Sequence, residues 1–152
     1  MSQSQNIRKD FGALGVSGFE ISSKKVYEEL TQATTLTAED SGKTFYLNAA
    51  TEFAVTLPAV ADAAGFKAKF VIKAAPSGAN YSVASAAADI SGAILSPADA
   101  TGASAATAGT PITTISFVSA KAVKGDFIEI ESDGAAFYVS GSSTVFDGIA
   151  FA

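Results

Sequence analysis

The residues that come closest to a reactive motif are Gly42, Lys43 and Thr44. A phosphate-binding loop ends in Gly-Lys-Ser or Gly-Lys-Thr and holds phosphates with backbone amides at the start of a helix. The motif is incomplete here, because Thr37 occupies the position of its first glycine and the residues after Thr44 alternate like a strand. The sequence therefore predicts a turn over 40–42 that leads into a strand, with no cofactor bound.

Carboxylates are the second group of side chains that could do chemistry. They occur as adjacent pairs at 28–29 and 39–40. A glycosidase needs two carboxyl groups that face each other across a cleft, whereas neighbours on a strand point to opposite faces. Four further carboxylates lack the spacing of a calcium-binding loop: Asp126, Glu129, Glu131 and Asp133. We therefore predict solvated charges at these positions and no metal site.

The chain contains no histidine and no cysteine. Imidazole acid–base catalysis, thiolate chemistry, disulfides and Cys/His zinc sites are therefore excluded. Together with the incomplete phosphate motif, this composition predicts that the protein is not an enzyme. We expect it to work by binding a partner or by building a structure.

The charge distribution argues against nucleic-acid and membrane partners. The formal net charge is -5, which offers no electrostatic attraction for phosphate backbones or anionic lipids. Lysines at 67, 69 and 73 form a basic row, but alternation places Phe66 and Phe70 on the opposite face.

No apolar run approaches the roughly 18 residues needed to cross a bilayer, and residues 1–10 lack the apolar run of a secretory signal. We expect a protein made in the cytoplasm that binds neither nucleic acid nor membrane.

Two regions of different composition must position these side chains. Residues 1–33 are expected to form a flexible N-terminal arm, because glycine recurs among polar residues in its first part. The end of this arm, 24–32, has the apolar spacing of a short amphipathic helix. Residues 34–152 are expected to form one β domain. Five apolar side chains of the arm are the candidate partner-binding residues: Phe11, Leu14, Val16, Phe19 and Ile21.

From residue 34 onward, apolar and polar residues alternate, and turn residues interrupt the pattern. Asp133 and Gly134 predict a tight hairpin turn, and 84–110, rich in Ala, Ser, Gly and Thr, is predicted to be a long loop with one short strand. The expected strands are 44–48, 53–57, 66–73, 81–83, 112–118, 126–131, 135–141 and 145–151. The fold class is therefore all-β: a small β-sandwich or barrel of about seven to nine short antiparallel strands.

Several stretches of the β domain combine turn and strand signatures in an order that resembles a known family. They are 35–45 (TLTAEDSGKTF), 53–59 (FAVTLPA), 65–66 with 70–73 (GF, FVIK), 125–141 (GDFIEIESDGAAFYVSG) and 145–147 (VFD). Together they resemble the small head decoration (cement) proteins of tailed bacteriophages, over most of residues 34–152. Similar modules occur in phage tail and fibre proteins.

This resemblance implies a compact β domain on the exterior of a virion capsid. Proteins of that family commonly cluster as trimers at three-fold positions of the shell and engage it with N-terminal arms. The implied partner is the major capsid protein, and a homotrimer is the favoured oligomer. The family brings no catalytic residues to carry over. We therefore expect a structural virion protein that stabilises the phage head.

A receptor-binding or tail-fibre module is the alternative function. In that case the 84–110 segment would display a contact surface to a glycan or protein on the host cell. Aromatic rings in this segment would favour the alternative, because sugars stack on them, and 84–110 contains none.

Overall fold

The computed structural model describes residues 26–49, 51–101 and 104–152, with the backbone alone for 104–110. Within these residues the chain forms twelve strands, β1 to β12, and two short 3-10 helices, η1 (Ala38–Asp40) and η2 (Val60–Asp62). No helix in this part of the chain is long and apolar enough to span a membrane. The prediction of an all-β sandwich is confirmed, with more strands than expected.

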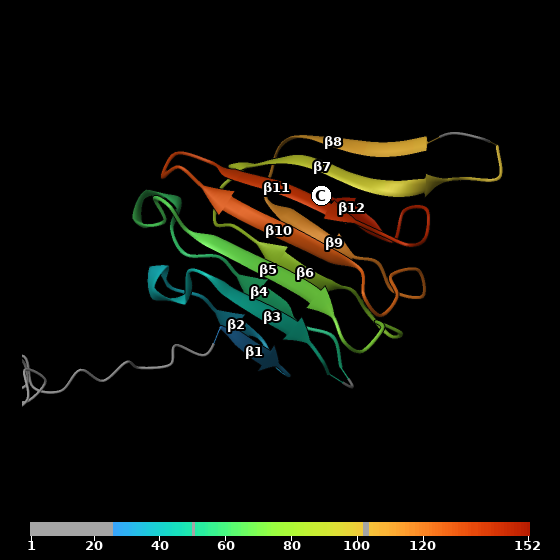
Figure 1. The fold of residues 1–152 in the computed structure, drawn as a ribbon, viewed down its shortest axis with the longest axis horizontal. Coiled ribbons are helices and arrows are strands. Elements are labelled where there is room, and N and C mark those ends of the chain that lie inside the picture. The colour runs from blue at the N-terminus through green and yellow to red at the C-terminus, as the bar shows by residue number, and fades with distance from the viewer. Residues whose placement is uncertain (1–25, 50, 102–103) are drawn as a thin grey trace, which may run out of the picture.

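The strands form two sheets that enclose one core (Figure 1). The seven-stranded sheet has the order β1-β3-β5-β10-β11-β7-β8, which runs from bottom to top in Figure 1. Its strands are β1 (Tyr27–Leu30), β3 (Lys43–Leu47), β5 (Lys67–Ile72), β10 (Phe127–Ser132), β11 (Phe137–Ser142), β7 (Ile90–Ala98) and β8 (Ser104–Ile112). The five-stranded sheet is ordered β12 (Ile149–Phe151), β9 (Thr114–Phe117), β6 (Tyr81–Ala84), β4 (Ala54–Thr56) and β2 (Thr34–Thr35).

The first six strands alternate between the two sheets. Odd-numbered β1, β3 and β5 lie parallel in the larger sheet, and even-numbered β2, β4 and β6 lie parallel in the smaller one. The chain therefore winds through three coils, each with one strand in either sheet. Parallel neighbours require such crossovers, since a tight hairpin reverses the chain.

The second half of the chain closes the sheets largely with antiparallel pairs. β10 pairs antiparallel with β5 and β11, and β9 with β6 and β12. The exception is β7, which lies parallel to β11. Both sheets are thus mixed, and the prediction of antiparallel strands is correct only in part. Alternation reports which side chains face inward but not the direction of a neighbouring strand.

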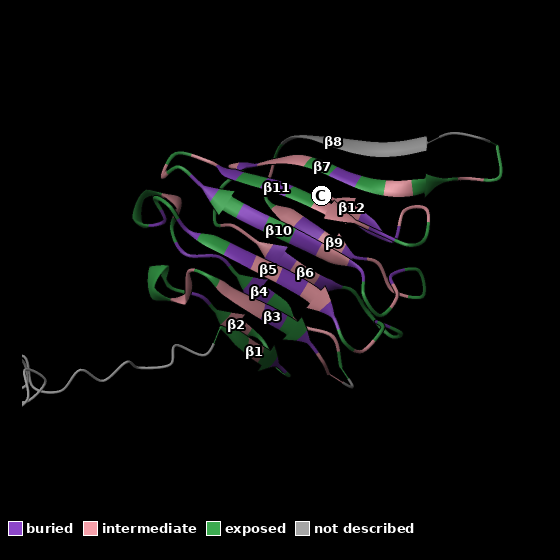
Figure 2. Ribbon diagram, viewed as in Figure 1, coloured by how far each residue is buried: buried purple, intermediate pink, exposed green. Residues whose placement is uncertain are grey.

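Large apolar side chains fill the space between the sheets. Phe45, Phe70, Phe117 and Phe137 are fully buried, and the rings of Phe45 and Phe70 stack with centroids 5.3 Å apart. Buried and accessible residues alternate along β5 and β10 (Figure 2). The buried hydroxyl of Tyr81 donates to the carbonyl oxygen of Ala49 at 3.1 Å, which satisfies the one polar atom of its ring.

The predicted helix within 24–32 is wrong. Residues Tyr27–Leu30 form β1, which pairs with β3 in parallel. Leu30 is buried opposite Leu47, while Tyr27 is exposed. Backbone pairing and burial of Leu30 outweigh the weak helical spacing of so short a segment. The β domain therefore begins before residue 34, inside the predicted arm.

The predicted long loop at 84–110 is also wrong. Most of it forms β7 and β8, which pair antiparallel with two irregularities in register. These strands are rich in small residues, which allow neighbouring backbones to approach closely. A Cβ added to Gly92 would lie 1.9 Å from the carbonyl oxygen of Val139, so only glycine fits there. The few bulky residues of β7, Ile90, Ile94 and Leu95, stand too far apart among small ones to give an apolar alternation.

Candidate interaction surface

The solvent-facing side of the seven-stranded sheet, here called the outer face, gathers the exposed aromatic and charged side chains. Tyr27 is 62% exposed, Tyr138 51% and Tyr46 36%. Tyr46 and Tyr138 stand at outward positions because their strand neighbours Phe45, Leu47 and Phe137 point into the core. Tyr27 lies on the face of β1 opposite to the buried Leu30. Large exposed rings on a folded protein mark surfaces that can contact a partner.

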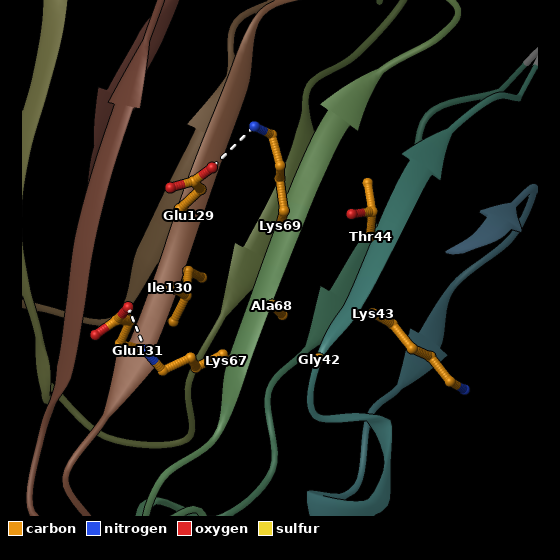
Figure 3. A pocket seen from close by; sticks show the side chains of 9 residues that line it. All are labelled: Gly42, Lys43, Thr44, Lys67, Ala68, Lys69, Glu129, Ile130 and Glu131. Atoms are coloured by element: carbon orange, nitrogen blue, oxygen red, sulfur yellow. Dashed lines mark hydrogen bonds and ion pairs between the residues drawn. The ribbon is translucent and has the colours of Figure 1, made fainter. Parts of the chain in front are cut away.

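Cross-strand ion pairs occupy the centre of the outer face (Figure 3). Lys67 Nζ lies 2.9 Å from Glu131 Oε1, and Lys69 Nζ lies 2.8 Å from Glu129 Oε1. Each pair joins residues directly opposite in the β5–β10 register. We call the shallow depression of about 270 Å³ around them the ion-pair trough. All four side chains are well exposed, so each pair adds at most about 1 kcal/mol to stability.

Lys43 points away from the trough toward β1, as Figure 3 shows. Its Nζ lies 2.6 Å from Asp40 Oδ1 and 3.1 Å from Glu28 Oε2. Gly42 has φ +87° in the turn, and β3 begins at Lys43. The predicted turn followed by a strand is confirmed, and the lysine is engaged by two carboxylates of its own chain.

The electrostatics of this group follow from its hydrogen bonds. Burial acts to raise the pKa of Asp40, but hydrogen bonds from Lys43 and from the backbone N–H of Thr37 outweigh it and lower that pKa. The hydrogen bond to Asp40 raises the pKa of Lys43. Both groups are therefore charged at neutral pH, and the cluster closes the end of the sandwich beside η1.

A second depression lies across the parallel strands β1, β3 and β5. We call it the tyrosine hollow; it has a volume of about 430 Å³ and is lined by Tyr27, Glu29, Tyr46, Val71, Lys73 and Lys124. The rings of Tyr27 and Tyr46 meet edge to face with centroids 6.3 Å apart. Glu29 pairs with Lys73 and accepts a hydrogen bond of 2.6 Å from Asn48 Nδ2. Apolar rings and a fixed ion pair thus stand side by side.

The candidate carboxylates are not brought together. Glu28 and Glu29 point to opposite faces, because this segment is a strand and not the predicted helix. The prediction of a solvated charge is wrong for Asp126, which is buried and accepts hydrogen bonds from backbone and hydroxyl groups. Glu129 belongs to the ion-pair trough, and Asp133 caps the β10–β11 turn. Among the described residues no group of three or more acidic side chains is arranged to hold a metal ion.

Asp133 and Tyr138 form a polar pair at the opposite side of the outer face. Hydrogen bonds from the backbone N–H groups of Ala135 and Ala136, and from the Tyr138 hydroxyl, lower the pKa of Asp133. The same contact with Asp133 raises the pKa of Tyr138. The predicted Asp-Gly hairpin is confirmed, with Gly134 at φ +91°.

The five arm residues Phe11, Leu14, Val16, Phe19 and Ile21 lie outside the described residues. The tyrosine hollow, in contrast, was not predicted from the sequence. Tyr46 carried a usable signal, since it sits between two core residues of one strand and must face outward. Tyr27 carried none, because its segment has the spacing of a helix. A comparison of the chain with protein-family models, curated proteins and solved structures finds no match.

Proposed function

We propose that this protein is a structural virion protein that binds the outside of a phage capsid and stabilises the head. The proposal rests on the turn-and-strand patterns of residues 35–147, which resemble head decoration proteins. The all-β sandwich agrees with that resemblance at the level of fold class.

The observation that carries the proposal is the position of β1. β1 is an edge strand of the seven-stranded sheet and follows directly on residues 1–25. The candidate partner-binding residues therefore precede an edge strand in the sequence, and Val26 and Tyr27, where the described chain begins, have exposed side chains. Edge strands and the segments next to them can pair with another chain through main-chain hydrogen bonds.

An N-terminal binding segment suits a capsid lattice, because the lattice repeats the same binding site on every shell subunit. If three copies associate, each brings one N-terminal segment to the shell, and linked contacts raise the apparent affinity by an effective-concentration term. The partner is the major capsid protein, and the purpose is to clamp neighbouring shell subunits. In this proposal the β-sandwich provides a further surface that contacts the shell subunits.

Co-sedimentation with expanded capsid shells that lack the protein tests this function. The full chain is expected to bind saturably, at a fixed ratio to the shell subunit. A variant without residues 1–22 is expected to keep its far-ultraviolet circular dichroism spectrum and to lose shell binding, because it lacks all five arm anchors.

A matched variant changes polar residues of the same segment, Gln3→Ala with Gln5→Ala, and is expected to bind shells like the unchanged protein. Shell binding by the truncated protein would contradict the role of the arm. Failure of the full chain to bind shells, combined with retention on host cells, would instead favour the receptor-binding or tail-fibre alternative.

A further inference from the structure

The tyrosine hollow presents two aromatic rings in an arrangement that no core packing requires. Tyr27 and Tyr46 come from neighbouring strands, their ring planes are inclined by 72°, and both are substantially exposed. Val71 lies directly opposite Tyr46 in the sheet and adds an apolar floor. A volume of about 430 Å³ lies within the range of small-molecule sites, roughly 300–1,000 Å³.

The polar rim of the hollow is held in place by its own contacts. The Glu29 carboxylate receives hydrogen bonds from Lys73 and from Asn48. The bond from Lys73, and then that from Asn48, lowers the pKa of Glu29, so this carboxylate is ionised at neutral pH. Its two oxygens offer about four acceptor positions, which leaves capacity for hydroxyl groups of a ligand.

Lys124 gives the hollow an excess of positive charge. It is exposed and forms no ion pair within the described residues, whereas Glu29 and Lys73 cancel each other. The turn that carries it is anchored on both sides: Gly125 N–H donates to Ile72 O at 2.9 Å, and Val123 N–H donates to Asp126 Oδ2 at 3.0 Å. Of the two lysines that line the hollow, Lys124 is thus the one without an ion pair among the described residues, and it stands on an anchored turn.

We propose that the tyrosine hollow binds an acidic saccharide, a sugar ring that carries a carboxylate. The C–H face of the ring would stack on Tyr27 and Tyr46, its hydroxyls would bond to Glu29, and its carboxylate would pair with Lys124. A purely apolar ligand would desolvate the Glu29–Lys73 pair without replacing its water. A phosphate group would find one unpaired cation and no cluster of cations or backbone amides. This site does not depend on capsid binding.

Titration of the isotope-labelled full chain by nuclear magnetic resonance tests the proposal. The probes are a tetrasaccharide of alternating glucuronate and N-acetylglucosamine, and cellotetraose as a neutral sugar of equal length. We expect the acidic probe to shift the amide signals of Tyr27, Tyr46, Val71 and Lys124. Tyr46→Ala is expected to weaken its binding about tenfold, since an aromatic anchor is removed. Lys124→Gln is expected to reduce the preference for the acidic probe over the neutral one.

Tyr138→Ala is the matched control, because Tyr138 is a similarly exposed tyrosine on the same face but outside the hollow. It is expected to leave the affinity for the acidic probe unchanged. The proposal is overturned if neither sugar shifts these signals, if cellotetraose binds as well as the acidic probe, or if Tyr46→Ala binds normally. Loss of shell binding by Tyr46→Ala without any sugar binding would assign the hollow to the capsid contact instead.

Discussion

At the scale of single residues, several carboxylates organise turns by accepting hydrogen bonds from backbone N–H groups. Asp126 does so inside the core, Glu52 receives the N–H groups of 77–79, and Asp133 receives those of 135–136. Loops without secondary structure must satisfy their backbone groups in some other way. Asp126 and Asp133, two of the four carboxylates weighed for calcium binding in the sequence, therefore act as structural acceptors.

Asp126→Ala is expected to lower the free energy of unfolding by about 2–4 kcal/mol. The carboxylate accepts from the backbone N–H groups of Val123 and Thr144 and from two hydroxyls, at distances of 2.8–3.2 Å. Its removal leaves these buried or half-buried donors without an acceptor. Urea denaturation measures the loss. Asp62→Ala, at an exposed position, is the control and is expected to change stability little.

Glu52 makes stability depend on pH in the acid range. Hydrogen bonds from backbone N–H groups, that of Ser77 foremost, lower its pKa below the ordinary 4.5. A carboxyl with a lowered pKa stabilises the folded state above its unfolded pKa, and this contribution is lost as the pH falls through the folded pKa. Glu52→Gln is therefore expected to be less stable than the unchanged protein near neutral pH, with a difference that shrinks in acid.

Thermal unfolding between about pH 7 and about pH 3 checks this expectation. The control is Glu39→Gln, since the exposed Glu39 makes no hydrogen bond within the described residues. A Glu52→Gln difference that stays constant over the whole range would show that the carboxylate charge is not the cause.

At the scale of elements, the sequence predicts strands that carry bulky residues at every second position. β5 and β10 were predicted because Phe70, Ile72, Ile128 and Ile130 alternate with charged or exposed residues. Parallel pairing among β1, β3 and β5 could not be predicted, because alternation is the same in either direction. β7 and β8 were not predicted, because small side chains separate their few bulky residues, such as the buried Ile90 and Ile94, and interrupt the alternation. Their strand character comes from backbone pairing with β11 and with each other.

Gly92→Ala is expected to destabilise the protein by about 2 kcal/mol or more. Gly92 pairs with Val139 at φ +157°, and an added Cβ would lie within 2.8 Å of three backbone atoms of that residue. Either β7 shifts away from β11 or its pairing is lost. Gly78→Ala is the control, because its nearest contact would be an ordinary 3.5 Å. Equal denaturation midpoints for the two variants would contradict the tight β7–β11 approach.

At the scale of the whole molecule, the proposed capsid role requires a definite assembly state. We expect three copies to associate, so light scattering coupled to size-exclusion chromatography should give three times the chain mass of 15.3 kDa. A closed trimer presents identical surfaces around one axis, which matches a three-fold lattice position. A solution mass of one chain, for a protein that also binds shells as a single chain, would contradict the trimer. It would leave the proposed role of the arm unchanged.

The three coils also have a consequence for the order in which the molecule folds. The β10–β11 hairpin closes a short loop, whereas each parallel pair of the coils forms only after the chain has crossed to the other sheet and returned. We expect folding to begin at β10–β11, to recruit β5, and to add the coils outward until β1 docks last. Amide hydrogen exchange should then be slowest in β10 and fastest in β1. The ring of Tyr27 would accordingly be the last wall of the tyrosine hollow to assemble and the first to open.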